Sequence, residues 1–249
     1  MTASRRTALV TGSGRNIGRA IALDLARDGV NVIVNGSTSR EPCEETAAMV
    51  RDLGVEAEVM MCDVGDKAAL DALAAAAIER FGRVDILINN VAIRPVTPFL
   101  ECTEDDWQRV FDVNLNAPRR FAERFLPGMI EAGWGRIVNF SGMNAMKGHL
   151  NRPHVSTSKH GVLGLTRTLA VEFGPNGVTA NLVSPGPIKS ERDDPDFEAH
   201  IAKTISSNPT RRQGTPEEVS AAVRLLCSDA GAYINGQLIQ VNGGAALTA

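Results

Sequence analysis

Short apolar runs rich in β-branched residues alternate along the chain with longer segments of mixed polarity. Runs of this kind predict buried strands, because a parallel strand covered on both faces is apolar along almost its whole length. We expect strands over residues 8–10, 30–34, 55–61, 84–88, 136–140, 178–183 and 238–241.

The longer segments have the periodicity of amphipathic helices. Ile17, Ile21 and Leu25 recur every four residues and predict a helix over residues 17–28. The segment from Thr215 begins with a good N-cap, a proline at the first helical position and acids in the first turn. The further helices are expected to begin near Glu44, Asp66, Thr103, Val155 and Thr215.

Strand and helix alternate seven times, which predicts the α/β class: a doubly wound, Rossmann-type parallel sheet with helices on both faces. We expect one domain over residues 1–249, since α/β folds of this size are commonly single. The longest irregular piece, residues 184–197, contains three prolines and predicts a mobile lid followed by a short helix.

Composition narrows the class of partner. The 29 acidic and 26 basic residues are scattered, so neither a nucleic-acid stripe nor a polybasic membrane anchor is expected. No segment reaches the roughly 18 apolar residues of a membrane span, and the first residues lack a signal-peptide pattern. The chain is therefore expected to be cytoplasmic and to bind a small molecule. Its four cysteines form no C-x-x-C pair, which predicts free thiols and no metal site.

A glycine-rich turn lies between the first predicted strand and the first predicted helix. Its sequence, from Thr11 to Gly18, is TGSGRNIG. Glycines in this position make a tight turn and let backbone N–H groups approach a pyrophosphate at the positive end of a helix. A strand-to-helix turn without any ligand has the same pattern, so this motif alone is weak evidence.

Six further motifs follow in order. They are DV at residues 63–64, NNVA at 89–92, DVNLNA at 112–117, PG at 185–186, RRQGTPEEV at 211–219 and GQLIQVNGG at 236–244. Together with the glycine-rich turn they resemble the short-chain dehydrogenase/reductase family over essentially the whole chain. The resemblance implies a nicotinamide nucleotide held by Gly12, Ser13, Arg15, Asn16, Ile17, Gly18, Ser37, Asp63, Val64, Asn90, Val91, Ala92, Lys159, Pro185, Gly186 and Ile188.

The end of the second strand indicates which nucleotide is preferred. NAD-binding sheets place an acid on the ribose 2′-OH about twenty residues after the glycines, and residues 35–40 contain none. Arg15, Ser37 and Arg40 are suited instead to a 2′-phosphate, which favours NADP(H) over NAD(H). Asn16 stands where the family has a glycine, and its side chain occupies space that glycine leaves for phosphate.

The catalytic motif departs from the family pattern. The family's tyrosine lies four residues before its lysine, which is Lys159 here, so its position is taken by Val155. The catalytic serine lies about thirteen residues before the tyrosine, which points to Gly142, although a shift of one residue would restore Ser141. Of the family's catalytic residues, Asn114 and Lys159 are present.

A tyrosine one turn before a lysine has a direct chemical purpose. The lysine lowers the pKa of the phenol, and the phenol protonates the alkoxide that hydride transfer forms. A positioned general acid contributes roughly 10²–10⁴ in rate, and valine supplies no proton. Catalysis by the family's usual route is therefore not expected.

Three other groups are candidates for the proton. His154 has a suitable pKa but, if helical, points about 140° away from Lys159, so it would have to precede the helix. Ser141 is the second candidate. Lys159 can bind the ribose hydroxyls, which we favour, or relay protons with Asn114 and a water molecule. Arg152 and Asn144 could bind an anionic or carbonyl group, or be solvated loop residues.

Three functions from different classes fit these observations. The first is an atypical NADP(H)-dependent oxidoreductase that acts on a small carbonyl or alcohol substrate. The second is a non-redox enzyme, such as a lyase or isomerase. The third is an inactive binding or scaffold subunit. The resemblance also implies a homotetramer or dimer joined through residues 103–132 and 155–173, where Val162, Leu165 and Leu169 add apolar surface.

Overall fold

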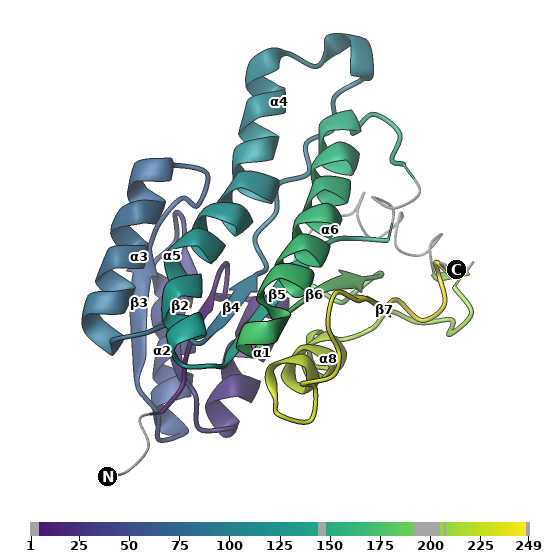
Figure 1. Ribbon diagram of the computed structural model, residues 1–249. Coiled ribbons are helices and arrows are strands. Elements are labelled where there is room, and N and C mark those ends of the chain that lie inside the picture. Colours follow the sequence, from purple (N-terminus) through teal and green to yellow (C-terminus); the bar gives the residue numbers. More distant parts are fainter. Residues whose placement is uncertain (1–4, 144–147, 192–204, 207, 248–249) are drawn as a thin grey trace.

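The computed structural model describes residues 5–143, 148–191, 205–206 and 208–247. Seven parallel strands form one sheet in the order β3-β2-β1-β4-β5-β6-β7 (Figure 1). The chain thus starts at the centre, winds to one edge, returns to the centre and winds to the other. The strands are β1 (Thr7–Val10), β2 (Asn31–Gly36), β3 (Ala57–Met61), β4 (Ile86–Asn89), β5 (Gly135–Phe140), β6 (Val178–Pro185) and β7 (Leu238–Val241).

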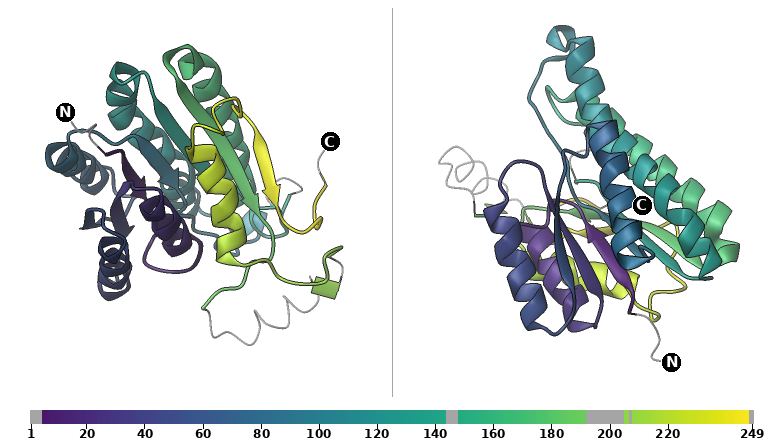
Figure 2. Two further views of the ribbon diagram at one scale, coloured as in Figure 1. Left: turned by 90° about the horizontal axis from the view of Figure 1, so that it is seen from below. Right: turned by 90° about the vertical axis from the view of Figure 1, so that its left-hand side faces the viewer.

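Helices cover both faces of the sheet (Figures 1 and 2). Ala8 and Val10 pack with α1 (Asn16–Arg27), α2 (Glu41–Asp52) and α8 (Pro216–Cys227). Leu9, whose side chain points to the opposite face, packs with α3 (Lys67–Phe81), α5 (Ala117–Glu131) and α6 (Pro153–Phe173). The doubly wound Rossmann-type sheet expected from the sequence is therefore confirmed.

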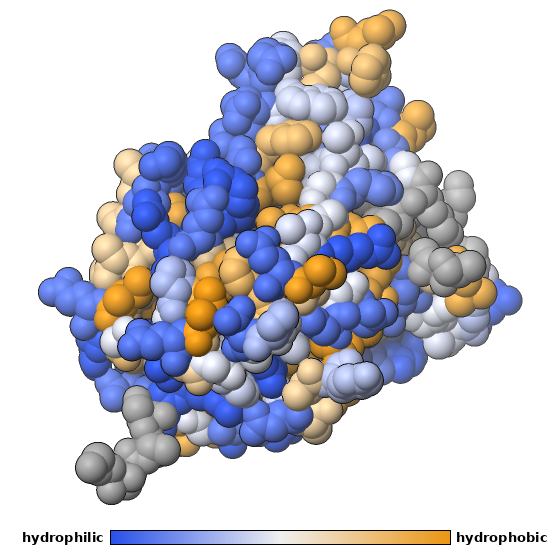
Figure 3. Space-filling view, viewed as in Figure 1, coloured by the Kyte–Doolittle hydropathy of each residue, from blue (hydrophilic) through white to orange (hydrophobic). Residues whose placement is uncertain are grey.

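Shorter helical segments with defined bounds among the described residues lie between β4 and α5 and after α6. They include η1 (Phe99–Glu101), α4 (Glu104–Phe111), the π-helical turn η2 (Asp112–Asn116) and η4 (Gly174–Asn176). Figure 1 shows α4 and the loop before it projecting beyond the sheet, and Figure 3 shows apolar side chains at the tip of this projection. No helix in the described parts of the chain is both long and apolar enough to cross a membrane.

The predicted strands exist, and so do the helices expected to begin near residues 17, 44, 66, 103, 155 and 215, with ends that differ by at most three residues. The largest difference is at α2, which begins at Glu41 rather than near Glu44 because Pro42 occupies its first turn. Likewise α6 begins at Pro153, two residues before the predicted start.

Part of the predicted lid lies outside the described residues, and Asn144 lies outside them entirely. The short helix expected after the lid falls largely on residues outside the described ranges. Val162 and Leu169 are buried within this chain, and Leu165 is partly buried, so these residues do not form a spare apolar face.

Candidate active site

The candidate site lies at the carboxyl ends of the central strands. Strands β1 and β4 are neighbours, but the chain leaves them in opposite directions across the sheet. In doubly wound sheets this reversal opens a crevice at the carboxyl edge, where ligands bind. The glycine-rich turn follows β1, and residues 90–94 follow β4, so both border this crevice.

Two glycines of the turn are required by close packing. Gly12 has a φ of +63°, and a Cβ added to it would lie 2.8 Å from Cγ2 of Val91. A Cβ on Gly18 would lie 2.2 Å from the carbonyl oxygen of Gly12. Any larger residue would therefore push α1 away from β1, and the turn brings the first N–H groups of α1 to the crevice. The N-cap residue, Arg15, makes no side-chain capping hydrogen bond to this end of α1.

The side chain of Ser13 joins β1 to β2. It is fully buried, and Oγ donates to the carbonyl of Val10 at 2.7 Å while accepting from the Asn35 N–H at 3.1 Å. The Asn35 amide donates to the carbonyls of Met60 and Cys62 and so ties β2 to β3. A nucleotide can meet only the backbone of Ser13. Sequence reasoning missed Asn35, although an amide within an apolar strand was a signal that it has buried partners.

The end of β4 holds the glycine-rich turn in place. The Asn90 amide donates to the carbonyls of Thr11 and Gly12 at 3.0 and 3.2 Å. The N–H groups of Asn90 and Val91 both donate to the Thr11 hydroxyl. Ala92 follows as a half-buried residue. Asn90 and Val91 are thus brought together with the turn, as the motifs predicted.

Basic residues gather where a 2′-phosphate is expected. Burial and Glu44 raise the pKa of the Cys43 thiol, whereas Arg40, Arg19 and Arg15 lower it, which places three guanidinium groups around the end of β2. Arg40 pairs with Glu44, and Arg19 pairs with Glu45. Arg15 is exposed and has no ion pair within the described chain. Ser37 is also exposed, directly after β2.

Asp63 lies after β3, the strand next to β2. Its carboxylate accepts from the Gly65 N–H at 2.9 Å and from Arg109 at 2.8 Å. Burial opposes ionisation, but these two hydrogen bonds outweigh it and lower the pKa of Asp63. The side chain of Val64 is buried, so only its backbone can border a ligand. An ionised carboxylate thus stands at the predicted adenine position.

Lys159 and Asn114 lie deep in the crevice. Lys159 is 4% exposed, and Nζ donates to the Phe140 carbonyl at 2.6 Å. Burial, and then the positive charge of Arg94, lower the pKa of Lys159 from 10.5 to about 7. Asn114 lies in the π-helical turn, a feature common at functional sites, and exchanges hydrogen bonds of 2.9 and 3.0 Å with the backbone of Ile93.

Asn114 also connects the two sides of the site. Its amide donates to Ser158 Oγ at 3.3 Å, and Ser158 precedes Lys159 on α6. The sequence predicted Asn114 and Lys159 in one site, and the structure places them there. The π-helical turn itself was not predicted, because its residues fit an ordinary helix equally well.

The two positions at which the sequence analysis expects the family's tyrosine and serine differ in their surroundings. Val155 lies one turn before Lys159 on the same helix and is buried. A Cβ added to Gly142 would meet no heavy atom of a described residue within 4 Å. Ser141 is buried at the end of β5, where its N–H donates to the Val183 carbonyl. Ser141 and Gly142 are thus adjacent at the edge of the crevice.

The structure does not bring His154 to Lys159. Because α6 begins at Pro153, His154 lies within the helix and not before it. Its fully buried ring stacks on Trp107 of α4, with 6.4 Å between centroids, and Nδ1 accepts from the Val155 N–H. Burial lowers its pKa, although Asp106 opposes the shift. The hypothesis that His154 replaces the missing acid required a position before the helix, which it does not have.

The segment after β6 closes the other side of the crevice. A Cβ on Gly186 would lie 2.7 Å from Asn242, and the preceding Pro185 pairs with β7. Ile188 forms a bridge with Gly214. Asn16, with φ +50°, uses its side-chain oxygen to accept from the Glu191 N–H at 3.0 Å. The side chain that was expected to crowd a phosphate thus contacts this segment.

Ser190 is a further residue that the sequence did not single out. Its hydroxyl is buried without a hydrogen-bond partner in the described structure. An orphaned hydroxyl between the glycine-rich turn and the strand edge fits a site that a polar ligand completes. With the uncapped end of α1 and the exposed Arg15, it fits a nicotinamide nucleotide.

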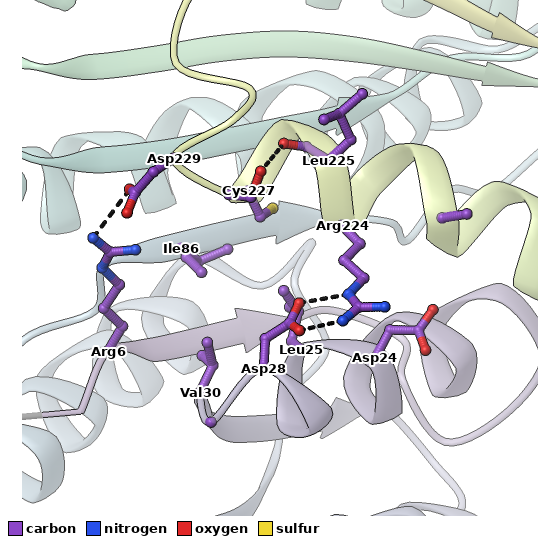
Figure 4. Close-up of a pocket in the computed structure, with 13 residues that line it drawn as sticks. Arg6, Asp24, Leu25, Asp28, Val30, Ile86, Arg224, Leu225, Cys227 and Asp229 are labelled. Atoms are coloured by element: carbon purple, nitrogen blue, oxygen red, sulfur yellow. Dashed lines mark hydrogen bonds and ion pairs between the residues drawn. The ribbon is translucent and has the colours of Figure 1, made fainter.

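A cavity of about 590 Å³ lies elsewhere, at the amino ends of the central strands. Figure 4 shows its charged walls, where Arg224 pairs with Asp28 and Arg6 pairs with Asp229. None of the residues predicted for the site lines it. Both of its arginines are already paired with aspartates of the same wall, so we assign no ligand to it.

Comparisons with known proteins cover nearly the whole chain. A sequence profile described as enoyl-(acyl carrier protein) reductase matches residues 12–246. The short-chain reductase protein NovJ of Streptomyces niveus is 36% identical over 244 residues, which are 95% of this chain and 92% of that protein. A 3-oxoacyl-(acyl-carrier-protein) reductase of Synechocystis sp. is 36% identical over 246 residues, 98% of each chain.

Solved structures agree with the sequence relatives. A protein described as a short-chain alcohol dehydrogenase from Sinorhizobium meliloti superposes with a TM-score of 0.90 at 33% identity, covering 97% of this chain and 96% of the other. Acetoin dehydrogenase YohF from Salmonella typhimurium gives 0.88 at 30% identity, with 96% and 95% covered. The chain is a member of the short-chain dehydrogenase/reductase family of oxidoreductases.

Proposed function

We propose that the protein is an NADP(H)-dependent oxidoreductase that acts on a small carbonyl or alcohol substrate through an altered proton-transfer site. The observation that carries this proposal is Lys159. Its ammonium is buried, the positive charge of Arg94 acts on it, and no acid among the described residues contributes to its shifted pKa. A buried cation without a carboxylate lowers stability, so packing does not explain this lysine, whereas a role in binding or proton transfer does.

The chain's own residues divide into three groups around the nucleotide. The first N–H groups of α1 and the glycine-rich turn bind the pyrophosphate, and Asp63 accepts from the adenine amino group. Arg15 and Ser37 bind the 2′-phosphate. Lys159 binds the ribose hydroxyls beside the nicotinamide. A bound nicotinamide nucleotide supplies the hydride for reduction of a C=O group, or accepts it from an alcohol.

Reduction of a carbonyl to an alcohol requires a proton in addition to the hydride. Val155 cannot donate one. Lys159 titrates near neutrality, so its ammonium can deliver a proton through a water molecule to the alkoxide, and the neutral amine can be reprotonated from solvent. Asn114 bonds Ile93 and Ser158, the residue before Lys159, and so positions this part of the site. In our proposal the Ser141 hydroxyl is a second donor to the oxygen.

The names of the relatives support carbonyl and alcohol chemistry. They include oxoacyl reductases, an alcohol dehydrogenase and acetoin dehydrogenase. All of these names describe interconversion of a carbonyl and an alcohol, which is the reaction class that we propose for this chain.

The test measures NADPH oxidation with a panel of ketones and aldehydes. The loss of absorbance at the nicotinamide band gives the rate. We expect measurable turnover that falls by about 100-fold or more in Lys159→Met. His160→Gln is the matched control, since His160 is the exposed next residue of the same helix. NADPH binding without oxidation would instead indicate a non-redox enzyme. Activity only after an active relative is added would indicate a scaffold subunit.

A further inference from the structure

Arg152 directly precedes α6, and its charge is only partly exposed to solvent. Nε is buried without a hydrogen-bond partner, and its guanidinium forms no ion pair with any described acid. Burial lowers the pKa of Arg152. A guanidinium that is partly removed from water gains free energy when a carboxylate binds it, because the bond replaces lost hydration.

The position of Arg152 relates it to the site. Arg152 is the N-cap residue of α6, with φ −141° and ψ 55°, and Lys159 follows seven residues later on the helix. At about 1.5 Å per residue, the two positions are about 10 Å apart along the helix axis. Val155 lies between them on α6. Lys159 is thus the inner end of one wall of the crevice, and Arg152 is its outer end.

A second loop brings another positive charge to the same wall. Arg94 follows Ile93, whose N–H and C=O groups are both bonded to Asn114. Three residues later, the Thr97 N–H donates to the Asn151 carbonyl at 2.7 Å. This hydrogen bond ties the loop that carries Arg94 to the loop that carries Arg152.

Asp106, the acid whose charge acts on His154 near the start of α6, is already engaged. On α4, Asp106 accepts from the N–H and the hydroxyl of Thr103, forming that helix's capping box. The side chain of α6 that faces Asp106 is His154, which stacks on Trp107. The neighbouring helix therefore does not supply Arg152 with a hydrogen-bonded carboxylate.

We propose that the substrate is an oxo acid whose carboxylate binds Arg152 while its carbonyl lies toward Lys159. Arg94, whose charge acts on Lys159, adds positive charge near the carbonyl end. This inference rests on the proposed oxidoreductase function and names its substrate class. Val155 contributes an apolar surface for the carbon chain between the carbonyl and the carboxylate.

A matched pair of substrates tests the proposal. The pair is 4-oxopentanoate and its methyl ester, which have the same carbonyl and differ in the charge of the acid group. We expect the parent's kcat/KM to be about tenfold or more higher for the acid than for the ester. A hydrogen bond to a charged group strengthens binding by roughly a factor of ten or more. Arg152→Gln should reduce this acid-over-ester ratio about tenfold, mainly through KM for the acid.

Arg80→Gln is the charge-matched control, because Arg80 lies on α3 and pairs with Glu56. It should leave the acid-over-ester ratio unchanged. If the parent uses ester and acid equally well, or if Arg152→Gln changes both alike, the oxo-acid inference is wrong while the oxidoreductase function stands.

A binding measurement covers the case in which neither compound is reduced. Calorimetric titration of 4-oxopentanoate into protein saturated with NADP⁺ should show binding that is weakened about tenfold in Arg152→Gln. Absence of binding in the parent, or equal binding in the variant, would overturn the inference. Failure of the whole carbonyl panel to oxidise NADPH would refute the oxidoreductase function separately.

Discussion

The crevice has a nucleotide half, from β1 to β4, and a catalytic half, at β5 and α6. The two halves differ in whether the packing of the fold requires their motif residues. In the first half the motif residues also hold the fold together: Gly18 has no room for a Cβ, and Asn90 clamps the turn. In the second half, a Cβ added to Gly142 would meet no described atom within 4 Å. A motif that packing requires survives whether or not the protein is an enzyme. Only residues that packing does not require, such as Lys159, are informative about chemistry.

The largest effect should come from restoring the catalytic half. Val155→Tyr places a phenol one turn before Lys159. Gly142→Ser adds a hydroxyl at a position where no described atom lies within 4 Å of the new Cβ. The double variant should reduce carbonyl substrates at least ~100-fold faster than the parent, which is the low end of what one positioned general acid supplies. The serine variant alone should gain little, because it adds no proton source. Initial rates of NADPH oxidation measure both.

Equal rates in parent and double variant would show that the catalytic half already has its own donor. In that case Ser141→Ala becomes the next measurement. If both proteins bind NADPH and neither oxidises it, the crevice serves another reaction, and the comparison between the two halves becomes one between binding and non-redox chemistry.

The second prediction concerns the stability cost of Lys159. Its folded pKa is about 7 and its ordinary value is 10.5. Between these values the unfolded chain binds more protons than the folded one, so the free energy of unfolding rises with pH. Lys159→Met removes this dependence, and Arg94 stays charged throughout. The stability advantage of the Met variant should therefore be roughly 2 kcal/mol smaller at pH 9 than at pH 7.

Urea unfolding of both proteins at the two pH values measures this difference, and the effects of groups they share cancel. A constant difference between the parent and Lys159→Met would mean that Lys159 stays protonated in the folded protein. It would then bind the ribose as a plain cation and could not relay protons near neutrality.

The sequence predicted the sheet well because local patterns decide it. Buried parallel strands are nearly all apolar, and caps such as Thr215 mark helix starts. The motif order also led us to expect Asn90 beside the glycine-rich turn, and the structure has Asn90 bonded to that turn. The roles of Asn114 and Lys159 in binding and catalysis stay predictions. The sequence did not predict that the Ser13 side chain is buried in hydrogen bonds to β1 and β2, or that the Ser190 hydroxyl is buried without a partner in the described structure. Both facts depend on contacts between distant segments.

The third prediction tests the nucleotide half. Arg15 is exposed at the start of α1 without an ion pair to another described residue, so it is available for a 2′-phosphate. We expect NADPH to bind about tenfold more tightly than NADH, and Arg15→Gln to remove most of this preference. Arg27→Gln, at the other end of α1, is the control. Calorimetry measures each affinity, and a preference for NADH in the parent would contradict the assignment.

The smallest effect is expected at His154, which lies beside the catalytic half but faces away from it. Its ring stacks on Trp107, and its Nε2 is buried without a partner in the described structure. Phenylalanine keeps the stacking and removes the unsatisfied nitrogen, although it also loses the contact between Nδ1 and the Val155 N–H. These opposing changes should leave NADPH oxidation by His154→Phe within about twofold of the parent, because the ring takes no part in proton transfer. A loss of about 100-fold, with the variant still folded by circular dichroism, would show that the ring reaches the substrate during turnover. The catalytic half would then contain its own acid after all, and Val155 would mark a changed position of the donor, not its loss.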